Sequence, residues 1–270
     1  MQWRRQADAV SRRGAAPPST RPDADPGTGG RLATVRRAAR GARDRLAGQL
    51  AALHPGLTYA NLAVRGRKAG EIREEQLGPA LALAPDLVGM TGGLNDLLRP
   101  KLDLDAVLAD LGTIQGALGA AGATVLTFTL PDLSAVTPTA RPVRGRLAAY
   151  NDGLRALART HGSVLVEVAG HEIGADPRLW AADRLHPNAE GHARLAAAAA
   201  EALALPGADD GWTRGLQAAP PSPLPAVVLR ETVWTVRFLA PWVGRRLRGT
   251  SSGDGRTAKR PTLSPPDARA

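Results

Sequence analysis

The chain alternates between two hydrophobic patterns from residue 44 to residue 207. Apolar residues that recur every three or four positions predict helices at 44–53, 71–83, 103–121, 144–161 and 188–205. Between them, short runs rich in aliphatic and β-branched residues predict strands at 57–62, 86–90, 124–129 and 163–168. Strands that alternate with helices form a parallel sheet with helices on both faces, joined by right-handed crossovers. We therefore expect one α/β domain over residues 44–207.

The segments on either side of this domain lack the alternation. Residues 1–43 are rich in Arg, Pro and Gly and show neither period, so we expect them to be unstructured. Residues 208–248 combine a Pro-rich spacer with an amphipathic helix, in which Trp234, Phe238 and Trp242 fall four apart on one face. Residues 249–270 are expected to form a disordered tail.

The positive charge lies outside the predicted domain. The formal net charge is +10, but residues 1–45 and 211–270 each carry a net +7, whereas residues 46–210 carry −4. A mildly acidic globule between cationic tails argues against a nucleic-acid partner. The arginines beside the aromatic stripe of Trp234, Phe238 and Trp242 leave two interpretations open, a helix docked on the globule and a weak contact with an anionic membrane surface.

Several classes of site are excluded by composition. The chain has no cysteine, which rules out disulfides and thiolate chemistry. The five histidines share no ligand spacing, so we expect neither a metal nor a cofactor, and we interpret His171 and His192 as surface or capping residues. The sequence shows neither a membrane-spanning run nor the apolar block of a secretion signal, so we expect a cytoplasmic protein. We also expect it to be a monomer.

Polar side chains follow the predicted strands. In the last loop, Asp183 stands three residues before His186 and can hold one imidazole nitrogen, which leaves the other to accept a proton. Asn95 follows the strand at 86–90 and offers amide donors without charge, and Gly66 follows the first predicted strand with a backbone N–H. Each motif alone also fits a surface pair or the cap of a neighbouring helix.

Taken together, Gly66, Gly93-x-Asn95-Asp96 and Asp183-x-x-His186-Pro187 resemble the motifs of the GDSL/SGNH hydrolase superfamily of esterases and lipases. The resemblance covers residues 44–206 and implies a three-layer, flavodoxin-like fold. It also implies roles: the Gly66 N–H and the Asn95 side chain as oxyanion donors, His186 as general base and then acid, and Asp183 as its orienting partner.

The family's first motif is missing from this chain. A Gly-Asp-Ser normally ends the first, central strand and supplies the nucleophile, and no such run occurs here. Ser134 follows the strand at 124–129 but stands too far along its loop, and Ser19 has no predicted strand to hold it. We therefore expect the sheet to lack its first strand, and we hypothesise that residues 1–43 are not the natural start of this domain, through a shifted reading frame or a mis-set start codon.

Three functions are compatible with these observations. The first is a carboxylic ester hydrolase that acts through an acyl-enzyme on a small-molecule ester, with its serine absent from this chain. The second is a catalytically inactive relative that binds an acylated or glycosylated ligand in the same cleft. The third is an adaptor that contacts anionic surfaces through the cationic tails.

Overall fold

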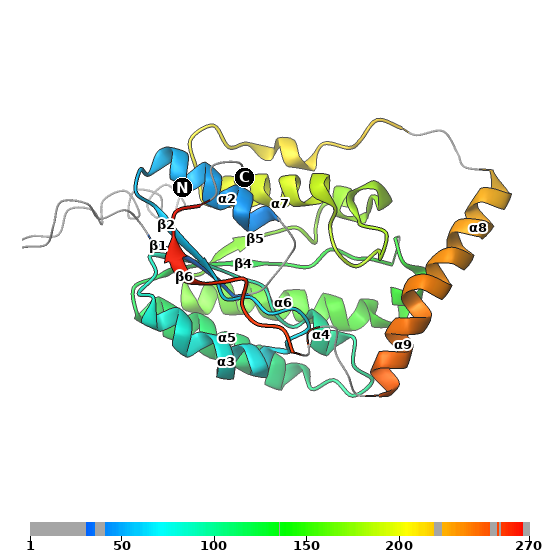
Figure 1. The fold of residues 1–270 in the computed structure, drawn as a ribbon, viewed down its shortest axis with the longest axis horizontal. Coiled ribbons are helices and arrows are strands. Elements are labelled where there is room, and N and C mark those ends of the chain that lie inside the picture. Colours follow the sequence, from blue (N-terminus) through cyan, green and yellow to red (C-terminus); the bar gives the residue numbers. More distant parts are fainter. Residues whose placement is uncertain are drawn as a thin grey trace, which may run out of the picture.

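A six-stranded sheet forms the centre of the computed structural model, which describes residues 31–35, 41–134, 136–218, 223–248, 253 and 255–266. The strands follow the order β5-β4-β3-β1-β2-β6 across the sheet, and the first five along the chain are parallel (Figure 1). Their bounds are β1 (Arg31–Val35), β2 (Thr58–Asn61), β3 (Leu87–Met90), β4 (Thr124–Phe128), β5 (Val164–Val166) and β6 (Arg260–Ser264).

Helices cover both faces of the sheet and complete a three-layer α/β fold, as the sequence predicts. On one face lie α2 (Ala42–Leu53) and α7 (Ala189–Ala202); on the other lie α3 (Ala69–Ala82), α5 (Leu104–Ala120) and α6 (Arg144–His161) (Figure 1). Each face buries its own apolar cluster. Short helical turns fill the remaining connections: α4 (Leu94–Leu97), η1 (Pro138–Val143), η2 (Glu172–Ala175), η3 (Pro177–Leu179) and η4 (Asp210–Thr213).

The expected gap in the sheet does not exist. Residues 31–35, which lie inside the segment predicted to be unstructured, form β1 between β2 and β3, with Arg31 opposite Thr58 and Val35 opposite Met90. Within the rest of that segment, Ala42 and Arg43 begin α2, and residues 1–30 and 36–40 lie outside the described residues. The prediction failed because β1 has only two large apolar residues and so shows no strand pattern in the sequence. β1 is instead stabilised by its backbone hydrogen bonds to β2 and β3, which would otherwise have unpaired backbone groups inside the sheet.

The tail predicted to be disordered also contributes a strand. β6 pairs antiparallel with β2, with Tyr59 opposite Ser264 and Asn61 opposite Arg260. The Arg260 guanidinium lies 5.6 Å from the centre of the Tyr59 ring. Backbone hydrogen bonds to an edge strand need no apolar pattern in the added strand, so periodicity could not reveal it.

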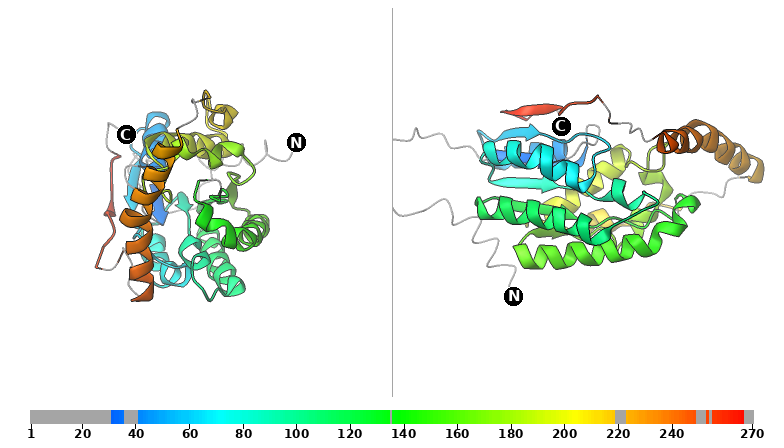
Figure 2. Two further views of the ribbon diagram at one scale, coloured as in Figure 1. Left: turned by 90° about the vertical axis from the view of Figure 1, so that its right-hand side faces the viewer. Right: turned by 90° about the horizontal axis from the view of Figure 1, so that it is seen from below.

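A long helical segment crosses one end of the domain. It consists of α8 (Leu224–Trp234), the π-helical turn η5 (Thr235–Leu239) and α9 (Ala240–Leu247) (Figures 1 and 2). The π turn lies just ahead of Pro241, which lacks the N–H that a regular α-helix requires at that position. None of the helices in the described ranges combines the length and apolar character needed to cross a membrane.

Candidate functional site

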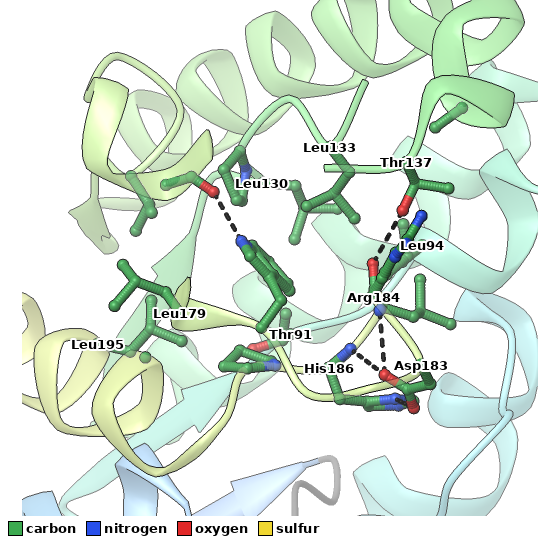
Figure 3. A pocket seen from close by; sticks show the side chains of 18 of the residues that line it. Thr91, Leu94, Leu130, Leu133, Thr137, Leu179, Asp183, Arg184, His186 and Leu195 are labelled. Carbon is green, nitrogen blue, oxygen red and sulfur yellow. Dashed lines mark hydrogen bonds and ion pairs between the residues drawn. The ribbon is translucent and has the colours of Figure 1, made fainter. Parts of the chain in front are cut away.

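A cavity of about 590 Å³ opens where the parallel strands end. Thr91 reaches it from the end of β3, and Leu130 follows β4. The loop before α7 contributes Asp183 and His186 (Figure 3). The segment α8–η5–α9 contributes Trp234, Phe238 and Trp242 to the lining. The lining is mainly apolar and aromatic: Leu94, Leu97, Phe128, Leu130, Leu133, Leu147, Leu179, Trp180, Leu195, Trp234, Phe238 and Trp242. The site is therefore a mainly apolar pocket whose polar lining includes Asp183 and His186.

Asp183 and His186 form a hydrogen-bonded pair at the cavity. The His186 Nδ1 atom lies 2.7 Å from Asp183 Oδ2. The other carboxylate oxygen, Oδ1, accepts the backbone N–H groups of Leu185 and His186, both at 3.0 Å. Both oxygens of Asp183 are thus committed, which fixes the plane of the imidazole and leaves Nε2 as the ring atom that can take up a proton.

The same contacts stabilise the ionised carboxylate. Burial is the largest influence on Asp183 and opposes ionisation. The hydrogen bond from His186, the charge of its imidazolium form and the two backbone N–H groups together outweigh burial, and they lower the pKa of Asp183 to about 2. The carboxylate therefore stays charged at neutral pH and can stabilise a protonated His186.

Arg184, between the two, adopts a backbone conformation that only glycine adopts readily. Its φ is +56°, which turns the chain so that Asp183 and His186 face each other. The Arg184 guanidinium forms two hydrogen bonds of 2.6 Å with Glu231 of α8, and it lies 4.6 Å from the centre of the Trp234 ring. The C-terminal helical segment is thereby fastened directly to the loop that carries the pair.

The predicted oxyanion donors lie beside the cavity rather than among its lining residues. Within the described residues the lining includes Leu94 and Arg65 but neither Asn95 nor Gly66. The Asn95 side chain donates to the Arg67 carbonyl oxygen at 3.0 Å, which joins the two loops that carry the predicted donors. Gly66 has a φ of +86°. Their part in catalysis stays a prediction.

Neither Asn95 nor Asp96 caps the helix that follows the turn, because α4 begins after Gly93 without a side-chain cap, and Asp96 instead contacts the start of α3. Its carboxylate accepts the backbone N–H of Ala69, the first residue of α3, at 3.1 Å. Burial raises the pKa of Asp96 despite that hydrogen bond. Asp96 thus links the loop after β3 to the start of α3, and the same turn carries Asn95 beside the cavity.

Three residues at the cavity were not found from the sequence. The Arg43 guanidinium of α2 donates to the Thr91 hydroxyl at 2.6 Å, and both side chains line the cavity. His192, interpreted from sequence as a surface or capping residue, is instead 5 % exposed and lines the same space. Its spacing of four residues from Ala196 was the available signal, because residues four apart share a helix face and Ala196 lies on the buried face of α7.

The buried His192 is held neutral. Burial is the main cause, and the positive charges of His186, Arg43 and Arg45 add to it, so the pKa of His192 falls to about 4. The Ala42 backbone N–H donates to His192 Nδ1 at 3.3 Å. His192 therefore supports the start of α2 without adding charge to the pocket.

The family's first motif would fall on the residues that follow β1. Val35 pairs with Met90, so the chain leaves β1 beside the point where β3 leads to Thr91. Residues 36–40 read Arg-Arg-Ala-Ala-Arg and lie outside the described residues. That run contains neither a hydroxyl nor a thiol.

A family model described as the GDSL-like Lipase/Acylhydrolase family matches residues 25–194, which is more than half of the chain. The chain belongs to this family. The match begins ahead of β1 and ends within α7, so it spans β1 to β5 and the Asp183–His186 pair. No curated protein sequence matches the chain.

Solved structures share the fold. An α/β hydrolase enzyme from the metagenome of Lake Arreo, Spain, is 22 % identical, with a TM-score of 0.56 over 66 % of this chain and 96 % of that one. An acetylxylan esterase from Geobacillus stearothermophilus is 20 % identical, with a TM-score of 0.58 over 70 % of this chain and 99 % of that one. The α/β architecture expected from the sequence is thereby confirmed.

Proposed function

We propose that the site is built for carboxylic ester hydrolysis, with His186 as general base and Asp183 as the group that orients it. The observation that carries the proposal is the 2.7 Å contact between Asp183 and His186 at the edge of an apolar cavity, at the carboxyl end of a parallel sheet. Family membership and the apolar lining support an acyl ester as substrate.

The chemistry requires a hydroxyl near His186 Nε2. That nitrogen would take the hydroxyl proton as oxygen attacks the ester carbonyl, and it would return the proton to the departing alcohol. Water would then attack the acyl-enzyme by the same route and release the acid. Asn95 and the Gly66 N–H would donate to the carbonyl oxygen as it gains charge.

The serine for this route is absent at the expected position. Because the family places Gly-Asp-Ser at the end of the first strand, we assign the equivalent positions to Arg36, Arg37 and Ala38. Because β1 is present in the sheet, the chain differs from the family's first motif only in the residues that follow Val35. Our hypothesis of a shifted reading frame remains a proposal, which a Gly-Asp-Ser encoded in another frame directly after the Val35 codon would support.

The sequence of residues 36–40 favours a second candidate, an acyl-binding protein without catalysis. The two candidates predict different behaviour of one designed variant that carries Arg36→Gly, Arg37→Asp and Ala38→Ser. If the site is hydrolytic, this variant should hydrolyse nitrophenyl butyrate on the order of 10²-fold or more faster than the unsubstituted chain does. A site with no hydrolytic geometry gains nothing, although it still binds the ester.

The matched control adds His186→Ala to the same variant. The gain disappears if His186 is the base; a gain that survives this substitution contradicts the proposed mechanism. Chain-length dependence tests the cavity, because each buried methylene contributes about 0.8 kcal/mol, or roughly fourfold in kcat/KM. The octanoate ester should therefore exceed the acetate ester, whereas a preference for acetate contradicts an acyl-chain pocket.

A further inference from the structure

Exposed apolar side chains are concentrated on the helical segment that covers the cavity. In the described part of the chain seven large hydrophobic side chains are exposed, and six of them lie on α8, η5 and α9. The six are Leu224, Val228, Leu229, Val233, Val236 and Val243. The seventh, Leu53, ends α2 at a separate site. Scattered exposed hydrophobics need no explanation, but a patch confined to one element indicates a contact surface.

The segment is apolar on two opposite faces. Trp234, Phe238 and Trp242 fall four apart and line the cavity, so the aromatic stripe noted in the sequence faces inward. Leu229, Val233 and Val236 fall four and then three apart on the opposite face, and their exposed fractions are 65, 49 and 68 %. A helix that is hydrophobic all round is normally covered on every side. Here Trp234 on the inner face is buried and Phe238 and Trp242 are half-buried, whereas the outer face points away from the domain (Figure 2).

Cations accompany the outer face. The segment from 224 to 248 carries five arginines and a single acidic residue, Glu231. Arg230, Arg237 and Arg248 are exposed, although Arg237 also lines the cavity, with its guanidinium 5.9 Å from the centre of the Phe238 ring. Glu231 pairs with Arg184 of the loop that carries Asp183 and His186, and it also lies 3.5 Å from Arg230, so the segment as a whole keeps a positive charge.

We propose that this outer face, defined by Leu229, Val233 and Val236 with the flanking arginines, docks on an anionic lipid surface. A bilayer supplies both partners at once, since acyl chains cover the apolar strip and anionic headgroups pair with arginine. A second copy of the chain is disfavoured by charge, because a two-fold contact through this face would bring the same arginines opposite each other.

Docking in this orientation would place the helical segment α8–η5–α9, which lines the cavity with its inner face, against the membrane. A lipid ester would then have a short path to the Asp183–His186 pair, and this link rests on the proposed function. Binding to the membrane itself does not, because it requires neither a nucleophile nor turnover. Vesicle binding without ester hydrolysis would therefore support the docking surface and contradict only the proposal that a lipid ester reaches the Asp183–His186 pair.

Flotation with vesicles tests the proposal on the full-length chain. Vesicles of phosphatidylcholine and phosphatidylglycerol in equal parts should carry the protein to the top of the gradient, and pure phosphatidylcholine should carry much less. Retention should fall as salt is raised. Equal binding to both kinds of vesicle at every salt concentration would overturn the charge argument.

Variants locate the surface, because residues 1–30 also carry arginines and could bind vesicles independently. The triple variant Leu229→Ser, Val233→Ser and Val236→Ser should weaken binding at least tenfold. Leu53→Ser, an exposed apolar residue elsewhere, is the matched control and should bind as the wild type does. Arg230→Gln should weaken vesicle binding about fivefold. Arg159→Gln, at an exposed position of α6, should leave vesicle binding unchanged.

Circular dichroism melts of each variant separate loss of folding from loss of docking. If the folded triple variant binds anionic vesicles as tightly as the wild type, the proposal is wrong. It is also overturned if light scattering shows a wild-type dimer that the triple substitution converts to a monomer while vesicle binding is absent. In that case the occupant of the outer face is a second copy.

Discussion

Asp183 connects four parts of the site through one residue. Its carboxylate holds the imidazole of His186 and the two backbone N–H groups that shape the loop, while its carbonyl oxygen accepts the Trp234 indole N–H at 3.4 Å. The spacing Asp183-x-x-His186 predicted the side-chain pair only in combination with the other motifs that carry the family resemblance. The positive φ of Arg184 and the contact with Trp234 were not predictable, because they depend on a helix that lies about fifty residues further along the chain.

The neutral state of His192 gives a prediction about pH. A folded pKa of about 4, against an ordinary value of 6.5, means that the unfolded chain binds the proton more tightly between these values. The stabilisation is complete above pH 6.5 and is lost as the pH falls toward 4, by about 3 kcal/mol at most. Urea unfolding at pH 7, 5.5 and 4 should show this loss in the wild type and a smaller loss in His192→Gln.

Nuclear magnetic resonance gives the site-specific check. The His192 ring signals should titrate around pH 4. A midpoint near 6.5, with equal acid sensitivity in His192→Gln, would show that the imidazole is solvated rather than buried at the pocket.

At the scale of elements, helices and strands with strong internal patterns were predictable, and those defined by their neighbours were not. The helix predicted at 103–121 is observed as α5, capped by the Asp103 side chain, which accepts the Ala106 N–H at 2.9 Å. β1 and β6 escaped prediction because their pairing partners, not their own side chains, determine the extended conformation.

The turn between β3 and α4 depends on Gly93. Its φ is +80°, and an added Cβ would lie 2.5 Å from Tyr150 Cε2. Gly122 has a similar φ of +89° with no atom within 4 Å of an added Cβ, so it isolates the backbone contribution. We expect Gly122→Ala to destabilise the fold by about 1 kcal/mol and Gly93→Ala by about 3 kcal/mol, measured by urea unfolding.

An equal loss in the free energy of unfolding for Gly93→Ala and Gly122→Ala would contradict a steric clash between the added Cβ and Tyr150. The Tyr150 hydroxyl donates to the Gly92 carbonyl oxygen at 2.7 Å, so Tyr150 has little room to move away. The larger loss at Gly93 should therefore persist in the presence of stabilising salt.

The contact between Arg184 and Glu231 should hold the helical segment over the cavity. Removing the charge with Glu231→Gln leaves Arg184 partly buried without its ionic partner. We expect backbone hydrogen exchange in α8 and α9 to accelerate about fivefold, with the central strands unchanged. Glu190→Gln, which removes the ion pair with Arg194 on α7, is the matched control and should leave exchange in α8 and α9 unaffected.

An unchanged exchange rate in Glu231→Gln would mean that apolar contacts alone fasten the segment. Trp234 is then the remaining anchor, since it is 8 % exposed and packs against Arg184. The docking proposal does not depend on this outcome, because it concerns the opposite face of the helix.

At the scale of the whole molecule, the site is assembled from loops at the ends of β1 to β5 and from one helical segment outside the matched family region. The resemblance predicted which loops would carry the Asp183–His186 pair and Asn95. It said nothing of the roof formed by Trp234, Phe238 and Trp242, because residues 224–248 lie beyond the motifs. A spacing of four residues in a helix predicts that the side chains share a face. It does not predict which neighbouring element covers that face.

The central claim is that His186, oriented by Asp183, is positioned to activate a hydroxyl placed directly after β1. Covalent labelling with a fluorophosphonate, located by peptide mass spectrometry, tests it in the variant carrying Arg36→Gly, Arg37→Asp and Ala38→Ser. The account predicts an adduct on the introduced hydroxyl that disappears when His186→Ala is added. A folded variant that forms no adduct, or one whose adduct forms equally well without His186, would contradict it.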